Sequence, residues 1–289
     1  MSSTLKMCKM PISKTQIDRL GDRLKGGPHT ESDLRLLDDY RRSFGEAYEA
    51  VVQTIRQRGQ FPTGRLAKST LSVVEKLRRE SLRLSQMQDI AGCRVVVGNV
   101  VAQEQFVSSL ITEFPKASVM DRRNNPSYGY RAVHIIAEIS GKPIEIQVRT
   151  SLQHLWAEVS EKSSDVLDPT IKYGGGSESW RNFLTQSSKA VAAYEEFEKK
   201  CSEAVAAYEV MAAAHEKFKK ATAELLEYHL PDHEVQELRG NLEESTRKME
   251  RAEHEEQENR GELLRAWNST FNALNNMISW LDDLKRQKQ

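Results

Sequence analysis

Two carboxylates lie beside or inside apolar, β-rich runs of the sequence. Asp89 directly precedes the run IAGCRVVV, and Glu145 lies inside IEIQVRT, between two isoleucines. A carboxylate inside a strand is costly unless it is paired or holds a metal, and hard oxygen ligands together with substrate phosphates suit Mg²⁺. On adjacent strands the two could therefore form a Mg²⁺ site. Structural ion pairs with Arg94 or Arg149 explain the same pattern equally well.

Four basic residues gather ahead of these carboxylates in the segment GRLAKSTLSVVEKLRRE, namely Arg65, Lys68, Lys76 and Arg79. Lys76 and Arg79 are three positions apart on a predicted helix and share a face, so with the other two they could surround a polyphosphate. A solvated basic face is the plainer explanation, and for such a run taken alone it is the more frequent one.

The segment NNPSYGYRAVH places Tyr128 and Tyr130 in a loop that leads directly into a strand. An aromatic ring there could stack on a base, although tyrosines that pack back on their own domain are commoner. His134 is expected to be a hydrogen-bonded strand residue rather than a metal ligand. The sequence contains neither a His-Glu-x-x-His set nor a His-Asp dipeptide, so a histidine-based metallohydrolase has no support.

The order of helices and strands expected around these residues indicates an α+β domain, with helices packed on one mixed sheet. Valine and isoleucine enrichment on both sides of Ser140-Gly141 indicates a β-hairpin. The apolar spacing from Thr30 to Gly59 indicates a single amphipathic helix. The full expectation is helices over 30–59, 72–83, 103–114 and 151–162, a buried strand over 90–97, and hairpin strands over 131–139 and 142–150.

The composition changes beyond a break at DVLDPTIKYGGGSES. From Tyr194 to Leu225, apolar residues recur three and four positions apart as a heptad seam. A turn at HLPDHE and a second helical stretch from about Val235 complete a long helical hairpin or coiled-coil arm. The expected organisation is an N-terminal segment over 1–29, the α+β domain over 30–167, a linker over 168–180 and the helical arm over 181–289.

Charge and composition exclude several classes of protein. Lys+Arg and Asp+Glu both total 42, so no overall field attracts nucleic acid or anionic lipid. No stretch approaches the roughly 18 apolar residues of a membrane span, and the opening residues lack a signal-peptide run. Cys8, Cys93 and Cys201 are far apart and are expected to be reduced thiols. We expect a cytoplasmic protein with no membrane partner.

Four blocks in this order resemble the synthetase domain of RelA/SpoT proteins, which make the alarmones guanosine tetra- and pentaphosphate. They are the basic segment from Arg65 to Arg79, DIAGCR from Asp89, GYRAVH from Gly129, and EIQVRT from Glu145 followed by HLWAE. The similarity covers roughly residues 30–165. It implies a nucleotidyltransferase-like fold and a pyrophosphokinase that moves the β,γ-diphosphate of ATP to a ribose 3′-hydroxyl.

The resemblance also implies roles for single residues. It assigns Mg²⁺ to Asp89 and Glu145, and it makes Glu145 the group that receives the proton of the attacking hydroxyl. It implies that Arg65 and Arg94 hold the adenine of ATP. The expected ATP-binding residues are Arg65, Lys68, Lys76, Arg79 and Arg94, and the expected acceptor-binding residues are Tyr128, Tyr130, Arg131, His134, Gln147 and Arg149.

The chain departs from the family pattern at a few positions. One extra residue separates Arg65 from Lys68, the lysine expected ahead of Gly-Tyr is missing, and Ala132 stands where serine is common. The chain resembles a small alarmone synthetase with GDP or GTP as acceptor. The alternatives are a toxin that pyrophosphorylates the 3′ end of tRNA and a catalytically inactive helical interaction protein. The C-terminal helices could support a homo-oligomer or bind an antitoxin-like partner.

Overall fold

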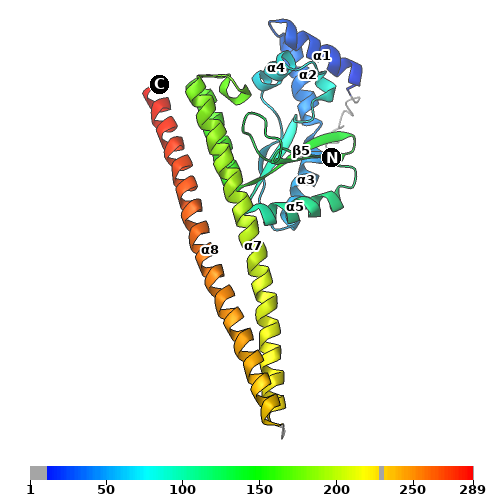
Figure 1. The fold of residues 1–289 in the computed structure, drawn as a ribbon. Coiled ribbons are helices and arrows are strands. Elements are labelled where there is room, and N and C mark those ends of the chain that lie inside the picture. The colour runs from blue at the N-terminus through cyan, green and yellow to red at the C-terminus, as the bar shows by residue number, and fades with distance from the viewer. Residues whose placement is uncertain (1–11, 228–230, 289) are drawn as a thin grey trace, which may run out of the picture. The chain divides into compact units, whose positions relative to one another are not determined.

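The computed structural model describes residues 12–227 and 231–288 (Figure 1). Cys8, the start of the expected N-terminal segment and part of the HLPDHE turn lie outside the described residues. The chain divides into two compact units, and each contains more than one stretch of sequence. The first contains Met1–Val97, Gln103–Asn125 and Ala132–Arg149, and the second contains Gly98–Ala102, Pro126–Arg131 and Thr150–Gln289.

A five-stranded sheet forms the centre of the first unit, with the strand order β1-β2-β5-β4-β3. Antiparallel pairs join β1 to β2, β3 to β4 and β4 to β5. Ser140 and Gly141 both have positive φ, 50° and 72°, which gives the β4–β5 hairpin the tight turn that matches strand twist. The strands are β1 Thr63–Arg65, β2 Ala91–Val97, β3 Ser118–Asp121, β4 Val133–Ile139 and β5 Lys142–Thr150.

The central strands have one apolar and one polar face. Val95, Ile135 and Ile146 are buried and point to the side where helix α3 packs against β2 and β4. Their sequence neighbours on the other face include His134 and Glu145, which are partly accessible. Side chains alternate between the two faces of a strand, so burying the valines and isoleucines presents these polar groups together. The predicted α+β class, with helices around one sheet, is confirmed.

Four helices lie wholly within the first unit, and one of them, α3, packs against β2 and β4 of the sheet. They are α1 Lys14–Gly26, α2 Glu31–Arg42, α3 Gly45–Gln57 and α4 Thr70–Arg79. A fifth helix, α5 Val100–Glu113, begins in the second unit and continues in the first. The prediction of one helix over 30–59 is wrong, because the chain breaks between α2 and α3. Ser43 donates its hydroxyl to the carbonyl of Tyr40 at 2.6 Å, and Gly45 is a poor interior helix residue.

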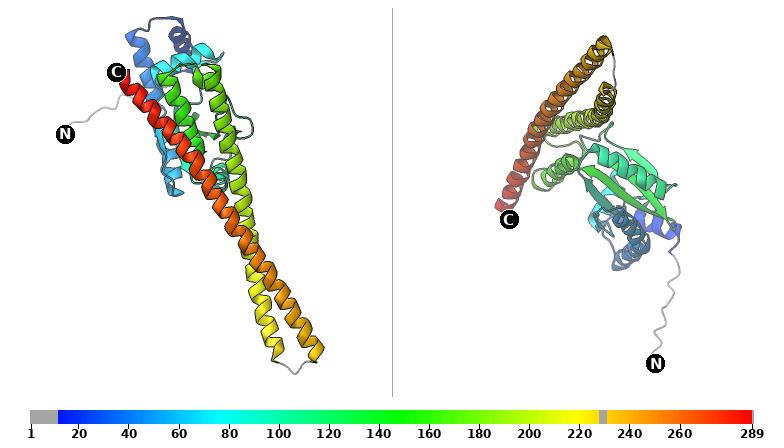
Figure 2. Two further views of the ribbon diagram at one scale, coloured as in Figure 1. Left: turned by 60° about the vertical axis from the view of Figure 1, so that its left-hand side comes forward. Right: turned by 90° about the horizontal axis from the view of Figure 1, so that it is seen from below.

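Three helices make up most of the second unit: α6 Ser151–Val166, α7 Glu178–Leu226 and α8 Asp232–Gln287. The helices α7 and α8 lie side by side as a long hairpin, and α6 packs against both (Figure 2). This confirms the predicted helical hairpin. None of the helices in the described part of the chain has the combined length and apolar character that a bilayer span requires.

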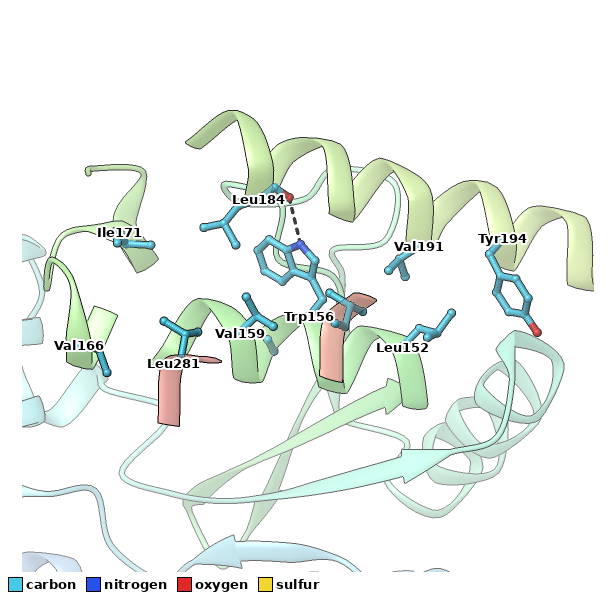
Figure 3. Close-up of a cluster of buried hydrophobic side chains, with 11 residues drawn as sticks. Leu152, Trp156, Val159, Val166, Ile171, Leu184, Val191, Tyr194 and Leu281 are labelled. Atoms are coloured by element: carbon cyan, nitrogen blue, oxygen red, sulfur yellow. Dashed lines mark hydrogen bonds between the residues drawn. The ribbon is translucent and has the colours of Figure 1, made fainter. Parts of the chain in front are cut away.

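The core of the second unit is centred on Trp156 of α6, whose indole N–H donates to the carbonyl of Leu184 at 3.0 Å (Figure 3). Leu274 and Leu281 of α8 pack into the same core. Ile171, from the segment predicted as a linker, is also buried there. The Pro/Gly-rich segment is therefore packed through this side chain, which an interruption of regular structure alone does not reveal.

The predicted heptad seam of α7 consists of two rows of residues, and the hairpin buries residues of only one of them. Tyr194, Cys201 and Thr222 are buried, whereas Phe218 and Leu225 are 38% and 46% exposed. The first three belong to a row of residues seven positions apart, and the last two to the alternate row. A two-helix hairpin thus covers one row of the seam. Cys93 and Cys201 are free thiols, as expected.

Candidate active site

Glu145 lies in the middle of β5 with both carboxylate oxygens hydrogen-bonded. Oε1 lies 2.8 Å from Nδ1 of His134, and Oε2 accepts from the side-chain amide of Gln147 at 2.8 Å. The β4–β5 register places His134 directly opposite Gln147, which brings the three side chains to one face. Burial raises the pKa of Glu145, but the hydrogen bond and charge of His134 and the Gln147 amide bring it below its ordinary value. The carboxylate is therefore ionised and fixed.

His134 is thus a hydrogen-bonded strand residue, as the sequence predicts. The network continues along β5, where Arg149 donates to the side-chain oxygen of Gln147 at 2.9 Å. Arg149 is almost fully buried. Three of the expected acceptor residues therefore form one hydrogen-bonded network with Glu145.

Asp89 is held by two ammonium groups. Lys68 Nζ lies 2.6 Å from one carboxylate oxygen and Lys76 Nζ lies 3.0 Å from the other. Burial raises the pKa of Asp89, but the charges and hydrogen bonds of Lys68 and Lys76 lower it below its ordinary value. The backbone N–H of Lys68 donates to the carbonyl of Ile90 at 2.7 Å, which fixes Lys68 beside the strand. The extra residue after Arg65 does not keep Lys68 from this site.

The two carboxylates are close enough to influence each other. In addition to burial, the negative charge of Asp89 raises the pKa of Glu145. Gly92 of β2, three residues after Asp89, lies close against Glu145, since an added Cβ would stand 2.8 Å from the carbonyl oxygen of Glu145 and 3.2 Å from its Cβ. Only glycine permits this approach, so β2 and β5 can bring the two acidic side chains into one region of the sheet.

The donor set fits Mg²⁺ held by few protein ligands. Within the described residues, no group of three or more His, Cys, Asp or Glu side chains could hold a metal ion. Mg²⁺ usually takes one or two carboxylates, keeps several waters and completes its shell with substrate phosphates, so Asp89 and Glu145 supply a sufficient protein share. The oxygens of Asp89 are already paired with two lysines, and a bound cation would have to share them.

The remaining ATP candidates lie on the neighbouring elements. In the antiparallel β1–β2 pair, Arg94 stands opposite Thr63 and Arg65 stands opposite Gly92. The side chain of Arg65 lies outside the described part of the structure. At the end of α4, Arg79 pairs with Glu80 at 3.0 Å. Their roles toward ATP stay predictions.

The other acceptor candidates lie on residues 126–131, which belong to the second unit. Tyr128 is 64% exposed and has a positive φ of 53°. Tyr130 packs against the hydrophobic core of that unit. Arg131 donates through Nε to the hydroxyl of Ser188 at 3.0 Å. Sequence reasoning missed Ser188, because a lone serine in a helical stretch carries no signal in the periodicity.

Residues 64–164 match the family described as a region found in RelA / SpoT proteins. The chain contains a RelA/SpoT region. All the candidate residues from Arg65 to Arg149 lie inside it, whereas α7 and α8 lie outside. The resemblance of the four sequence blocks is confirmed.

This chain is also similar to proteins from a bacterium and from a plant. The uncharacterized protein Rv1366 of Mycobacterium tuberculosis (strain ATCC 25618 / H37Rv) is 30% identical over 171 residues, which cover 56% of this chain and 63% of that protein. The chain thus spans just under two thirds of this relative. A probable chloroplastic GTP diphosphokinase, RSH2 of Arabidopsis thaliana, is 29% identical over 155 residues, covering 50% of this chain and 22% of that protein.

Among solved structures, the small alarmone synthetase 1 from Bacillus subtilis matches with a TM-score of 0.44 and 24% identity. The match covers 58% of this chain and 98% of that one.

Proposed function

We propose that this chain is a Mg²⁺-dependent pyrophosphokinase that transfers the β,γ-diphosphate of ATP to the 3′-hydroxyl of GDP or GTP. The observation that carries the proposal is the ionised Glu145, held by His134 and Gln147 and influenced by the charge of Asp89. A buried carboxylate with a shifted pKa is typical of a catalytic site. The RelA/SpoT region and a relative named as a probable GTP diphosphokinase support the same reaction.

In this reaction the 3′-oxygen of the acceptor forms a bond to the β-phosphorus of ATP. The bond from that phosphorus to the bridging α–β oxygen breaks, and AMP leaves. The hydroxyl proton passes to Glu145 and then to solvent. Because the pKa of Glu145 is lowered, it is a weak base, and we expect it to accept the proton only as the new P–O bond forms and the hydroxyl becomes acidic.

Neutralising the charge of the phosphates matters more for this reaction than proton transfer, because transfer of phosphoryl-type groups depends on positioning and on electrostatic stabilisation. Lys68 and Lys76 supply two positive charges next to Asp89. A polyphosphate that approaches Asp89 therefore meets cations already fixed in place. Mg²⁺, when bound by Asp89 and Glu145, neutralises further charge on the transferring group.

The test is a transfer assay with labelled ATP, Mg²⁺ and one acceptor at a time: GDP, GTP, an adenine nucleotide or tRNA. We expect a 3′-pyrophosphorylated guanine nucleotide and an equal amount of AMP, identified by mass spectrometry, with a Glu145→Gln preparation as control for contaminating enzymes. Label on the 3′ adenosine of tRNA and none on free nucleotides would favour the toxin alternative. Transfer to no acceptor at all would contradict the proposal and favour the inactive interaction protein.

A further inference from the structure

The segment 126–131, here named the tyrosine loop, is hydrogen-bonded to helix α7 at the hydroxyl group of Ser188. Ser188 donates this hydroxyl to the carbonyl of Gly129 at 2.6 Å and accepts from Nε of Arg131 at 3.0 Å. Ser188 is 3% exposed. One buried hydroxyl therefore uses both its donor and its acceptor capacity on the loop, which is what a fixed anchor requires.

The backbone of the tyrosine loop also lies close against α6. Gly129 has φ of 91°, and an added Cβ there would stand 2.6 Å from Cζ2 of Trp156 and 3.2 Å from Cβ of Ser188. Within the loop, the N–H of Tyr130 donates to the carbonyl of Ser127 at 2.9 Å. The loop is thus a tight turn packed between two helices of its own unit.

Glu195 adds a charge to the same side of α7. It lies seven positions after Ser188, so the two share a helix face. Glu195 is buried and accepts from the hydroxyl of Thr150 at 2.6 Å and from the amide of Gln153 at 2.8 Å. Its negative charge also acts on Arg131. A half-buried guanidinium on the loop therefore has its counter-charge on α7.

We infer that Ser188 and Glu195 are positioning residues that hold the tyrosine loop in place for acceptor binding. Helix α7 therefore contributes to catalysis by supporting this loop. The inference rests on the proposed function and on the expectation that Tyr128 and Tyr130 bind the acceptor. The RelA/SpoT region ends at residue 164, and both positioning residues lie beyond it. Helix α7 thus supplies a support that the matched region does not contain.

The first test compares Ser188→Ala with Thr185→Ala, which removes an exposed hydroxyl from the same helix. Loss of two hydrogen bonds is expected to speed amide exchange of residues 126–131 by about tenfold. The KM for the acceptor is expected to rise roughly threefold to tenfold, while the affinity for ATP, measured by calorimetry, stays unchanged. Thr185→Ala is expected to change neither quantity.

The second variant, Glu195→Gln, keeps the shape of the side chain and removes the charge near Arg131. We expect it also to raise the KM for the acceptor and to speed exchange in the tyrosine loop. Parental exchange rates and parental KM values in both Ser188→Ala and Glu195→Gln would overturn the inference. The exchange measurement needs no turnover, so an inactive parent would refute the proposed function while the test of the loop still gives its own answer.

Discussion

The two carboxylates of the candidate site differ in the partners that keep them ionised. Asp89 depends on Lys68 and Lys76, which are also the groups expected to meet phosphates. Glu145 depends on His134 and Gln147, which approach it along the sheet. Binding of a polyphosphate would compete for the partners of Asp89 and leave those of Glu145 in place. We therefore expect Asp89 to respond to ATP and Glu145 to remain fixed for the chemical step.

Replacing Glu145 by glutamine tests its role in the chemical step. Glu145→Gln keeps the size of the side chain but removes the charge that accepts a proton and binds Mg²⁺, so kcat is expected to fall by roughly 10²–10⁴. The affinity for ATP should change little. Single-turnover rates and calorimetry measure the two effects separately, with Glu138→Gln, an exposed position on β4, as control. Near-parental turnover of Glu145→Gln would remove it from the mechanism.

The pKa of Asp89 predicts a defined pH dependence of stability. Its folded pKa lies below the unfolded value of about 3.9, so the ion pairs contribute fully above that value and are lost as the pH falls through the folded pKa. The difference in unfolding free energy between the parent and Asp89→Asn should therefore narrow as the pH falls below about 4. Urea unfolding followed by far-UV circular dichroism from pH 6 to pH 3 measures it. A constant difference would contradict the assigned ion pairs.

The sequence could indicate these two carboxylates but not their partners. An acidic residue flanked by isoleucines in a strand is visible as a pattern, and so is an acidic residue just before an apolar run. The pairing of Asp89 with Lys68 and Lys76 joins residues 21 and 13 positions apart. Such contacts depend on how α4 and β2 pack, which periodicity does not encode. Ion pairing and metal binding therefore remained equal explanations before the fold was known.

Among the elements, the three apolar, β-rich runs of the central strands were predicted nearly to the residue. The strand expected over 90–97 is Ala91–Val97, and the hairpin strands are Val133–Ile139 and Lys142–Thr150. The short strands β1 and β3 were missed, because three or four residues cannot show a period. The strand β3 is also exposed along its whole length, so it lacks the alternation that marks a half-buried strand.

Gly141 and Gly129 both have positive φ, so alanine variants at these two positions distinguish the cost of backbone strain from the cost of a steric clash. Gly141 has φ of 72° and open space around it, whereas Gly129 has φ of 91° and would place a Cβ against Trp156. Gly141→Ala is expected to cost about 1–2 kcal/mol, the penalty for a left-handed residue. Gly129→Ala should cost more and also raise the KM for the acceptor, since the tyrosine loop must move. Thermal unfolding and acceptor kinetics measure both variants, and equal effects would show that Trp156 does not confine the loop.

Across the whole molecule, the compact units do not follow a single cut in the sequence. The expected boundary at residue 167 assumes that a domain is one continuous stretch. Residues 98–102 and 126–131 instead belong to the unit that also contains the helical hairpin. The tyrosine loop is therefore supported by Ser188, which follows Gly129 by 59 positions and Arg131 by 57. Sequence proximity alone groups the loop with the strand β4 that follows it, and gives no sign of its contact with Ser188.

The buried Glu195 gives the second unit a pH dependence of the opposite sign to that of Asp89. Burial raises the pKa of Glu195, and the hydrogen bonds from Thr150 and Gln153 and the charge of Arg131 offset this only in part. The folded unit thus holds the proton more tightly than the unfolded chain, whose glutamate pKa is about 4.3. The resulting stability is fully present below that value and is lost as the pH rises through the folded pKa.

Glu195→Gln cannot titrate, so the parent should become less stable relative to this variant as the pH rises from 4 to 8. All four tryptophans of the chain lie in the second unit, which makes their fluorescence a specific signal for its unfolding in urea. Asp89→Asn serves as the matched control, because it lies in the first unit and should leave these midpoints unchanged. A parent and a Glu195→Gln variant that keep the same difference in stability from pH 4 to pH 8 would show that Glu195 titrates as in the unfolded chain, which would contradict the raised pKa that its burial produces.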